Sequence, residues 1–157
     1  MPDPLLEAAR DTVDDGLREL RKAFEGADVA TLNTAPAGDD SSSLAVLGAH
    51  ALASTRSWLA LATQAPSPSR DRPAEFRTEV EDPAVFLAWF DGEAEVCRAL
   101  LTDAQAIDPG HIGFAPWRAG GLAEEPVTAA WALLHAVAHL REHVGHAQLT
   151  RQLLDGA

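Results

Sequence analysis

Four of the six histidines in this chain, His135, His139, His143 and His146, lie within twelve residues near its end. An α-helix turns by about 100° per residue, so His139 and His143 stand one turn apart on the same side and can reach one ion. Neutral imidazole is the commonest protein ligand for metals, whereas a lone histidine at the edge of a helical core is usually only hydrogen-bonded. Four in three turns therefore favour metal ligation over a purely structural role.

A third ligand must come from another helix, and His50 is the candidate. It lies in the middle of a predicted helix, three residues after Leu47 and eight before Trp58, close to the apolar stripe of that helix. An unpartnered imidazole there would be costly. Taken alone, His50 would be interpreted as a hydrogen-bonded core residue, and only the C-terminal cluster makes it a ligand candidate. His111 falls in a connection and is expected to be exposed.

Four long segments with helical spacing of apolar residues are predicted to position these histidines. Asp3-Pro4 and Asp82-Pro83 are N-cap and first-turn signatures, and they begin helices that run to about Phe24 and Thr102. A helix following the serines at 41–43 extends to about Thr63. The last helix is predicted to begin at Glu124-Glu125-Pro126 and to end near Leu154. Its core-facing stripe is expected to comprise Val127, Trp131, Leu134, Ala138, Leu149 and Leu153.

The connections at 27–40, 65–81 and 103–125 contain proline, glycine and polar residues and are predicted to be long loops. The last of them is expected to cover one end of the core or to act as a lid over a substrate. The sequence shows no strand alternation, internal repeat or glycine-rich phosphate loop. It therefore predicts an all-α fold, an antiparallel-type four-helix bundle with long connecting loops, in a single domain spanning 1–157.

The chain is acidic, with 12 Lys plus Arg against 24 Asp plus Glu and a formal net charge of −12. This charge, without any basic block, argues against a nucleic-acid or anionic-membrane surface. No apolar run reaches the roughly 18 residues of a spanning helix and the first residues do not resemble a signal peptide, so we expect a cytoplasmic protein. The single cysteine, Cys97, is expected to fill space in the core.

Two ordered motifs resemble the DinB/YfiT-like superfamily. The stretch from His139 to Gln148, with two histidines four apart before a glycine, is similar to the motif of that family's last helix. The stretch from Asn33 to His50, followed by Trp58-Leu59, is similar to its second-helix signature. His146 stands where the damage-inducible branch tends to carry glutamine, and the pattern looks closer to the branch that uses mycothiol.

The resemblance implies a four-helix bundle that holds a divalent metal, usually zinc or nickel, through three histidines. Carried over to this sequence, the ligands are His50, His139 and His143. His135 and His146 then support the ligands or line the pocket, or they are alternative ligands if the register differs by one turn. The family includes transferases and isomerases that use mycothiol or bacillithiol, so a small-molecule thiol and an electrophile are the expected partners. Members often form dimers, which makes a homodimer a further expectation.

Three imidazoles leave at least one coordination position open, as in catalytic rather than closed structural sites. A thiol bound at such a position loses its proton, and thiolate is the nucleophile. The leading hypothesis is therefore a metal-dependent thiol transferase. A metal-dependent hydrolase and a non-enzymatic, stress-related metal-binding bundle are the alternatives. Glu93 and Glu142 are expected to face solvent rather than the site.

Overall fold

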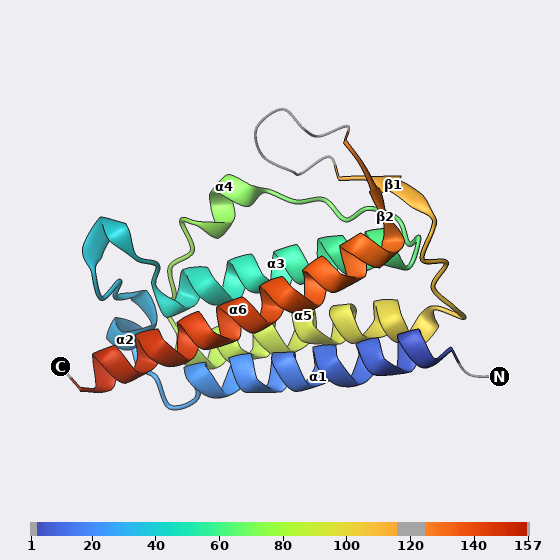
Figure 1. Cartoon of the computed structure of the whole chain (residues 1–157). Helices are drawn as coiled ribbons and strands as arrows, with labels where there is room; N and C mark the ends of the chain where they lie inside the picture. The colour runs from blue at the N-terminus through green and yellow to red at the C-terminus, as the bar shows by residue number, and fades with distance from the viewer. Residues whose placement is uncertain (1–2, 116–124, 157) are drawn as a thin grey trace.

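Four long helices form the body of the protein. The structure is a computed structural model that describes residues 3–115 and 125–156. The long helices are α1 (Pro4–Phe24), α3 (Leu44–Ala62), α5 (Pro83–Asp103) and α6 (Ala129–Asp155). They pack as a bundle (Figure 1), which confirms the predicted all-α four-helix class.

The contacts between helices set the order around the bundle. α6 packs against both α1 and α3, and α5 packs against the same two helices from the other side. Figure 1 shows that α3 and α5 run in the same direction, opposite to α1 and α6. The sequence had suggested an antiparallel-type bundle, but the helices are not antiparallel throughout. The reason is that the chain between α3 and α5 returns along the whole bundle before α5 begins.

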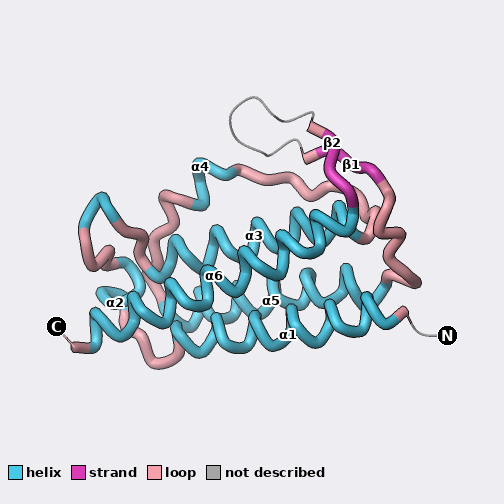
Figure 2. Tube along the Cα trace, in the orientation of Figure 1, coloured by secondary structure: helices cyan, strands magenta, loops and turns pink. Residues whose placement is uncertain are grey.

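Short elements occupy the connections. They are α2 (Val29–Asn33), the 3₁₀ turn η1 (Gly38–Asp40), α4 (Arg72–Glu75), β1 (Ile112–Phe114) and β2 (Pro126–Thr128). β1 and β2 pair antiparallel, with Ile112 opposite Thr128 and Phe114 opposite Pro126. Figure 2 shows this small sheet beside the end of the bundle where α6 starts, and α4 lying over α3. Strands of three residues are too short to show the alternation by which strands are recognised in a sequence.

Side-chain caps explain where most long helices begin. Asp3 accepts hydrogen bonds from the backbone N–H groups of Leu5 and Leu6 at the start of α1. Asp82 caps α5 in the same way, and the Ser43 hydroxyl accepts from Val46 N–H in α3. α1 ends before Gly26, whose φ of +68° suits glycine. These predicted boundaries are confirmed to within one or two residues.

The predicted start of the last helix was wrong. Residues Pro126–Thr128 pair with β1, and α6 begins only at Ala129, where Thr128 caps it through a hydrogen bond from Trp131 N–H. Glu124 lies outside the described residues. The β-branched Val127 and Thr128 suit a strand, and the threonine hydroxyl supplies the cap that the acidic residues were expected to supply.

The predicted core stripe of α6 was also wrong in most of its members. Leu134, Leu149 and Leu153 are exposed, Leu134 to 68%. The buried face lies on the other side of the histidine arc, and alanines alternate on it with larger residues: Ala132, Leu133, Ala136, Leu140, Val144 and Ala147. This is the face that packs against α1 and α3. The histidines still lie at the edge of the buried face.

Gly48 lets α3 pass close to two phenylalanines. A Cβ at this position would lie 3.1 Å from the Cζ atoms of both Phe24 and Phe86. We expect Gly48→Val to lower the free energy of unfolding by about 1 to 3 kcal/mol, because overpacking forces these rings to move. Gly92→Val is the matched control, since a Cβ on Gly92 of α5 would meet nothing within 4 Å. Urea denaturation of both variants checks this, and equal stabilities would contradict it.

Cys97 is fully buried, as expected for a core residue. Burial raises the pKa of its thiol to about 12, which makes thiolate chemistry at this residue unfavourable. Within residues 3–115 and 125–156, no helix is long and apolar enough to cross a membrane.

Candidate metal centre

His50 of α3 and the His139–His143 pair of α6 converge where the two helices pack. One ring nitrogen from each residue lies within 4.8 Å of those of the other two. The ring centroid of His50 is 5.1 Å from that of His139 and 5.0 Å from that of His143. The spacing of the pair follows from one helical turn, and the register between α3 and α6 supplies the third ring.

A carboxylate contacts His50 from outside the cluster. His50 Nδ1 lies 2.8 Å from Oε2 of Glu75, the last residue of α4. Arg70 donates from Nε to Glu75 Oε1 at 2.7 Å and from Nη2 to Oε2 at 3.0 Å. Because an ionised carboxylate only accepts, Nδ1 of His50 is the donor in this hydrogen bond, and Nε2 is the nitrogen left to face the other two histidines.

The nitrogens of the other two histidines fit a metal site. His139 Nε2 and His143 Nε2 lie 3.3 Å apart. The Nδ1 atoms of both residues are buried and have no hydrogen-bond partner among the described residues. Two neutral imidazoles whose Nε2 atoms lie this close together are suitable ligands for zinc or nickel, so the donor set fits the implied ion.

Burial keeps the helix pair neutral. It lowers the pKa of His139 to about 3, and the electrostatic repulsion between protonated His139 and the neighbouring His143 and His50 acts in the same direction. Burial likewise lowers the pKa of His143 to about 4, with smaller contributions from His50 and His146. Both imidazoles are therefore uncharged at neutral pH, which is the form that binds a metal. Burial alone would raise the pKa of Glu75, but the hydrogen bonds from Arg70 and His50 outweigh it, and the pKa is lowered.

These pKa values predict how the stability of the metal-free protein depends on pH. His139 and His143 have folded-state pKa values below the ordinary 6.5, so the unfolded chain binds more protons between about pH 6.5 and 4. The free energy of unfolding should therefore fall as the pH is lowered through that interval. Urea denaturation of metal-free protein at pH 7 and pH 5 measures the loss. It should be smaller in the His139→Gln/His143→Gln double variant, and an equal loss in both proteins would contradict the assignment.

The other candidates lie outside the triad. His135 stacks on Trp131, with centroids 4.7 Å apart and ring planes 8° apart, and both contact the buried Trp58. His146 is exposed, and its ring centroid lies 5.6 Å from that of His143. Neither belongs to the group of closely spaced ligand atoms.

Of the remaining polar candidates, only Glu142 is exposed as expected. His111 precedes β1 and is half-buried rather than exposed, and it is not among the clustered ligand atoms. Glu93 was expected to face solvent, but it is partly buried because it pairs with Arg56 at 2.8 Å. Neither glutamate reaches the histidines through a hydrogen bond in the described structure. The expected lid at 103–125 falls partly on 116–124, outside the described residues.

The connection between α3 and α5 contributes residues to the candidate metal centre that the sequence did not reveal. The stretch 65–81 was predicted to be a long loop with no part in the site, yet Glu75 is buried in it and Phe76 places its ring 4.9 Å from that of His50. One signal was present: Asp71 with Pro73 repeats the pattern of a capping aspartate close to a proline, and Asp71 caps α4 through Ala74 N–H.

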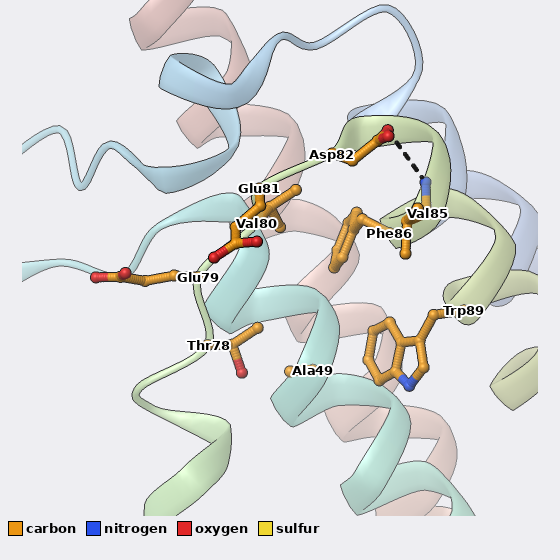
Figure 3. A pocket seen from close by; sticks show the side chains of 9 residues that line it. All are labelled: Ala49, Thr78, Glu79, Val80, Glu81, Asp82, Val85, Phe86 and Trp89. Atoms are coloured by element: carbon orange, nitrogen blue, oxygen red, sulfur yellow. Dashed lines mark hydrogen bonds between the residues drawn. The ribbon is translucent and has the colours of Figure 1, made fainter.

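Two hollows lie near this region. One, of about 590 Å³, lies between α3, α5 and residues 78–82, with Phe86 and Trp89 on its wall (Figure 3). None of the three histidines lines it. The other, of about 410 Å³, is lined by His146 and Leu149 of α6 and by Ser41 and Ser42 before α3. None of the three histidines lines the second hollow either, but His146 does, and its ring centroid lies 5.6 Å from that of His143.

Fold and site together define a class of protein: a four-helix bundle with three histidines gathered between two facing helices. The sequence model of the mycothiol-S-transferase family matches residues 7–156. The chain belongs to this family, which is part of the DinB/YfiT-like superfamily, and the resemblance found in its motifs is confirmed.

The structural comparison supports the same fold. A conserved protein from Enterococcus faecalis is similar with a TM-score of 0.72, over 96% of this chain and 97% of that chain. The two share 16% sequence identity, so this likeness shows the fold alone. None of the curated proteins matches the chain.

Proposed function

We propose that the protein is a metal-dependent S-transferase that uses a low-molecular-weight thiol of the mycothiol type. The observation that carries the proposal is the convergence of His50, His139 and His143 within 4.8 Å in a chain of the mycothiol-S-transferase family. Zinc or nickel is the proposed ion.

The ligands that the protein would supply are the imidazoles of three histidines. Three imidazoles that bind through one nitrogen each leave at least one coordination position for a further ligand. A divalent ion held there lowers the pKa of a bound thiol, so that it reacts as thiolate at neutral pH. In the proposed transfer, the S–H bond breaks and its proton passes to solvent. The sulfur then forms a bond to an electrophilic carbon of the co-substrate, and the bond from that carbon to its leaving group breaks, so that the leaving group departs with the electron pair.

The hollow beside His146 is the proposed place for the polar part of the thiol. Its wall combines the hydroxyl groups of Ser41 and Ser42 with the carboxylate of Asp40, while Leu149 supplies apolar surface. Hydroxyl and carboxylate groups suit a ligand rich in hydroxyls, such as a sugar-containing thiol. This placement is supported by His146, which lines the hollow and has its ring centroid 5.6 Å from that of His143.

The experiment that tests the function loads the protein with zinc or nickel and incubates it with mycothiol and a chromogenic electrophile. Metal-dependent loss of free thiol with formation of the thioether is the expected result. The same preparation should be inactive after chelation and regain activity when metal is restored. Hydrolysis of the electrophile without thiol consumption would instead establish the hydrolase alternative. Tight metal binding with no turnover of several thiols and electrophiles would favour a non-enzymatic metal-binding bundle.

A further inference from the structure

Glu75 is buried in a way that an ordinary loop glutamate is not. Only 7% of its side chain is exposed, and the side chain of Arg70 is 5% exposed. A buried carboxylate is costly unless its oxygens are hydrogen-bonded. Here three donors satisfy it, two from Arg70 and one from His50.

The segment around Glu75 is held in place by hydrogen bonds between side chains and its backbone. Asp71 caps α4 through Ala74 N–H, and Thr78 Oγ1 donates to the carbonyl oxygen of Glu75 at 2.9 Å. Further along, the Asn33 side chain exchanges two hydrogen bonds with the backbone of Val80. The carboxylate is therefore presented to His50 from a fixed position.

We propose that Glu75 is a positioning residue for the metal centre, and this inference rests on the proposed metal-binding function. By accepting a hydrogen bond from Nδ1–H of His50, it favours the tautomer of that imidazole whose Nε2 lone pair is free for an ion. It also fixes the ring orientation and makes the ligand more basic, as carboxylates hydrogen-bonded to metal-binding histidines generally do. Arg70 holds the carboxylate through both oxygens, so the arginine acts on the centre only through Glu75.

The three candidate ligands are not equivalent in this respect. His139 and His143 have buried Nδ1 atoms without partners among the described residues. Only His50 has a carboxylate on its outer nitrogen in the described structure. A hydrogen bond to Glu75 therefore fixes the ring orientation of His50. The rings of His139 and His143 are positioned by their spacing along α6.

The chain offers a matched control for Glu75. Glu93 also pairs with an arginine across the α3–α5 packing, at 2.8 Å from Arg56, but it has no histidine partner. Glu93→Gln therefore removes a comparable ion pair without touching the proposed centre.

The first test measures metal affinity by competition with a chromophoric chelator. Glu75→Gln should bind zinc about 10 to 100 times more weakly than the wild type, because one amide oxygen cannot serve both His50 and Arg70. The Arg70→Met/Glu75→Leu double variant removes the carboxylate without leaving an unpaired buried charge, and should show a similar loss. Glu93→Gln should bind as the wild type does. Wild-type affinity in a folded double variant would overturn the inference.

The second test needs no metal. In metal-free protein labelled with ¹⁵N-histidine, the NMR shifts of His50 should report a single tautomer protonated at Nδ1. The double variant should show a mixture of tautomers, whereas Glu93→Gln should not. An unchanged His50 tautomer in the double variant would overturn the inference.

The two proposals fail separately. Weaker metal binding in the Glu75 variants of a protein that transfers no thiol would support the positioning role and contradict the transferase. Thiol transfer by the wild type, together with a metal affinity that does not depend on Glu75, would support the transferase and contradict the positioning role.

Discussion

Replacing His50, His139 or His143 by alanine is expected to remove bound metal from the protein almost completely. The three imidazoles are the described groups whose ligand nitrogens lie within 4.8 Å of one another. With one of them gone, two ligands remain, and an ion held by two imidazoles exchanges readily with solvent. Elemental analysis of protein purified without a histidine tag should find about one ion per chain in the wild type and close to none in each variant.

Two other histidines serve as matched controls, one on α6 and one in the loop before β1. His146→Ala and His111→Ala each remove an imidazole, but neither residue belongs to the cluster of ligand atoms. Both should retain the ion at the wild-type level. Metal loss from these two variants to the same extent as from the triad would mean that the ion binds through scattered surface histidines. A wild-type protein that takes up neither zinc nor nickel would contradict the assignment of the three histidines as metal ligands.

The α6 pair could be predicted from the sequence because its geometry is local. His139 and His143 lie four residues apart in a helix, and this spacing alone brings their nitrogens together. His50 was predicted from its place in the middle of an apolar helix and from a family resemblance, and the structure brings it to the pair. Its role as a ligand remains a prediction.

What the sequence could not reveal depends on contacts between distant segments. Glu75 lies in a proline-containing stretch without periodicity, and only the return of the chain over α3 brings it to His50. The buried face of α6 was misjudged for a related reason. Large leucines mark a hydrophobic face in a sequence, but on the face that packs alanines alternate with larger residues, and Leu134 is left in solvent.

Phe90→Ala is expected to produce the opposite result from the histidine substitutions: a large loss of stability with the metal centre kept. Phe90 is fully buried on α5, and its ring contacts that of Phe24 edge to face, with centroids 5.4 Å apart. Truncating a phenylalanine in such a position removes apolar contacts and leaves a cavity, at a cost of about 3 to 5 kcal/mol. Urea denaturation measures this cost, and Val85→Ala on the exposed face of the same helix should change stability by less than about 0.5 kcal/mol.

The metal content of the Phe90→Ala variant shows whether metal binding depends on the packing of the core around α5. Phe90 belongs to α5, whereas the histidines lie where α3 meets α6, and Phe90 contacts none of them through its ring in the described structure. A domain of ordinary stability, about 5 to 15 kcal/mol, can lose this amount and remain largely folded in the cold. We therefore expect about one ion per chain in the folded variant at 4 °C. Loss of the ion from folded Phe90→Ala protein would show instead that the centre depends on the packing of the whole bundle, not on the α3–α6 contact alone.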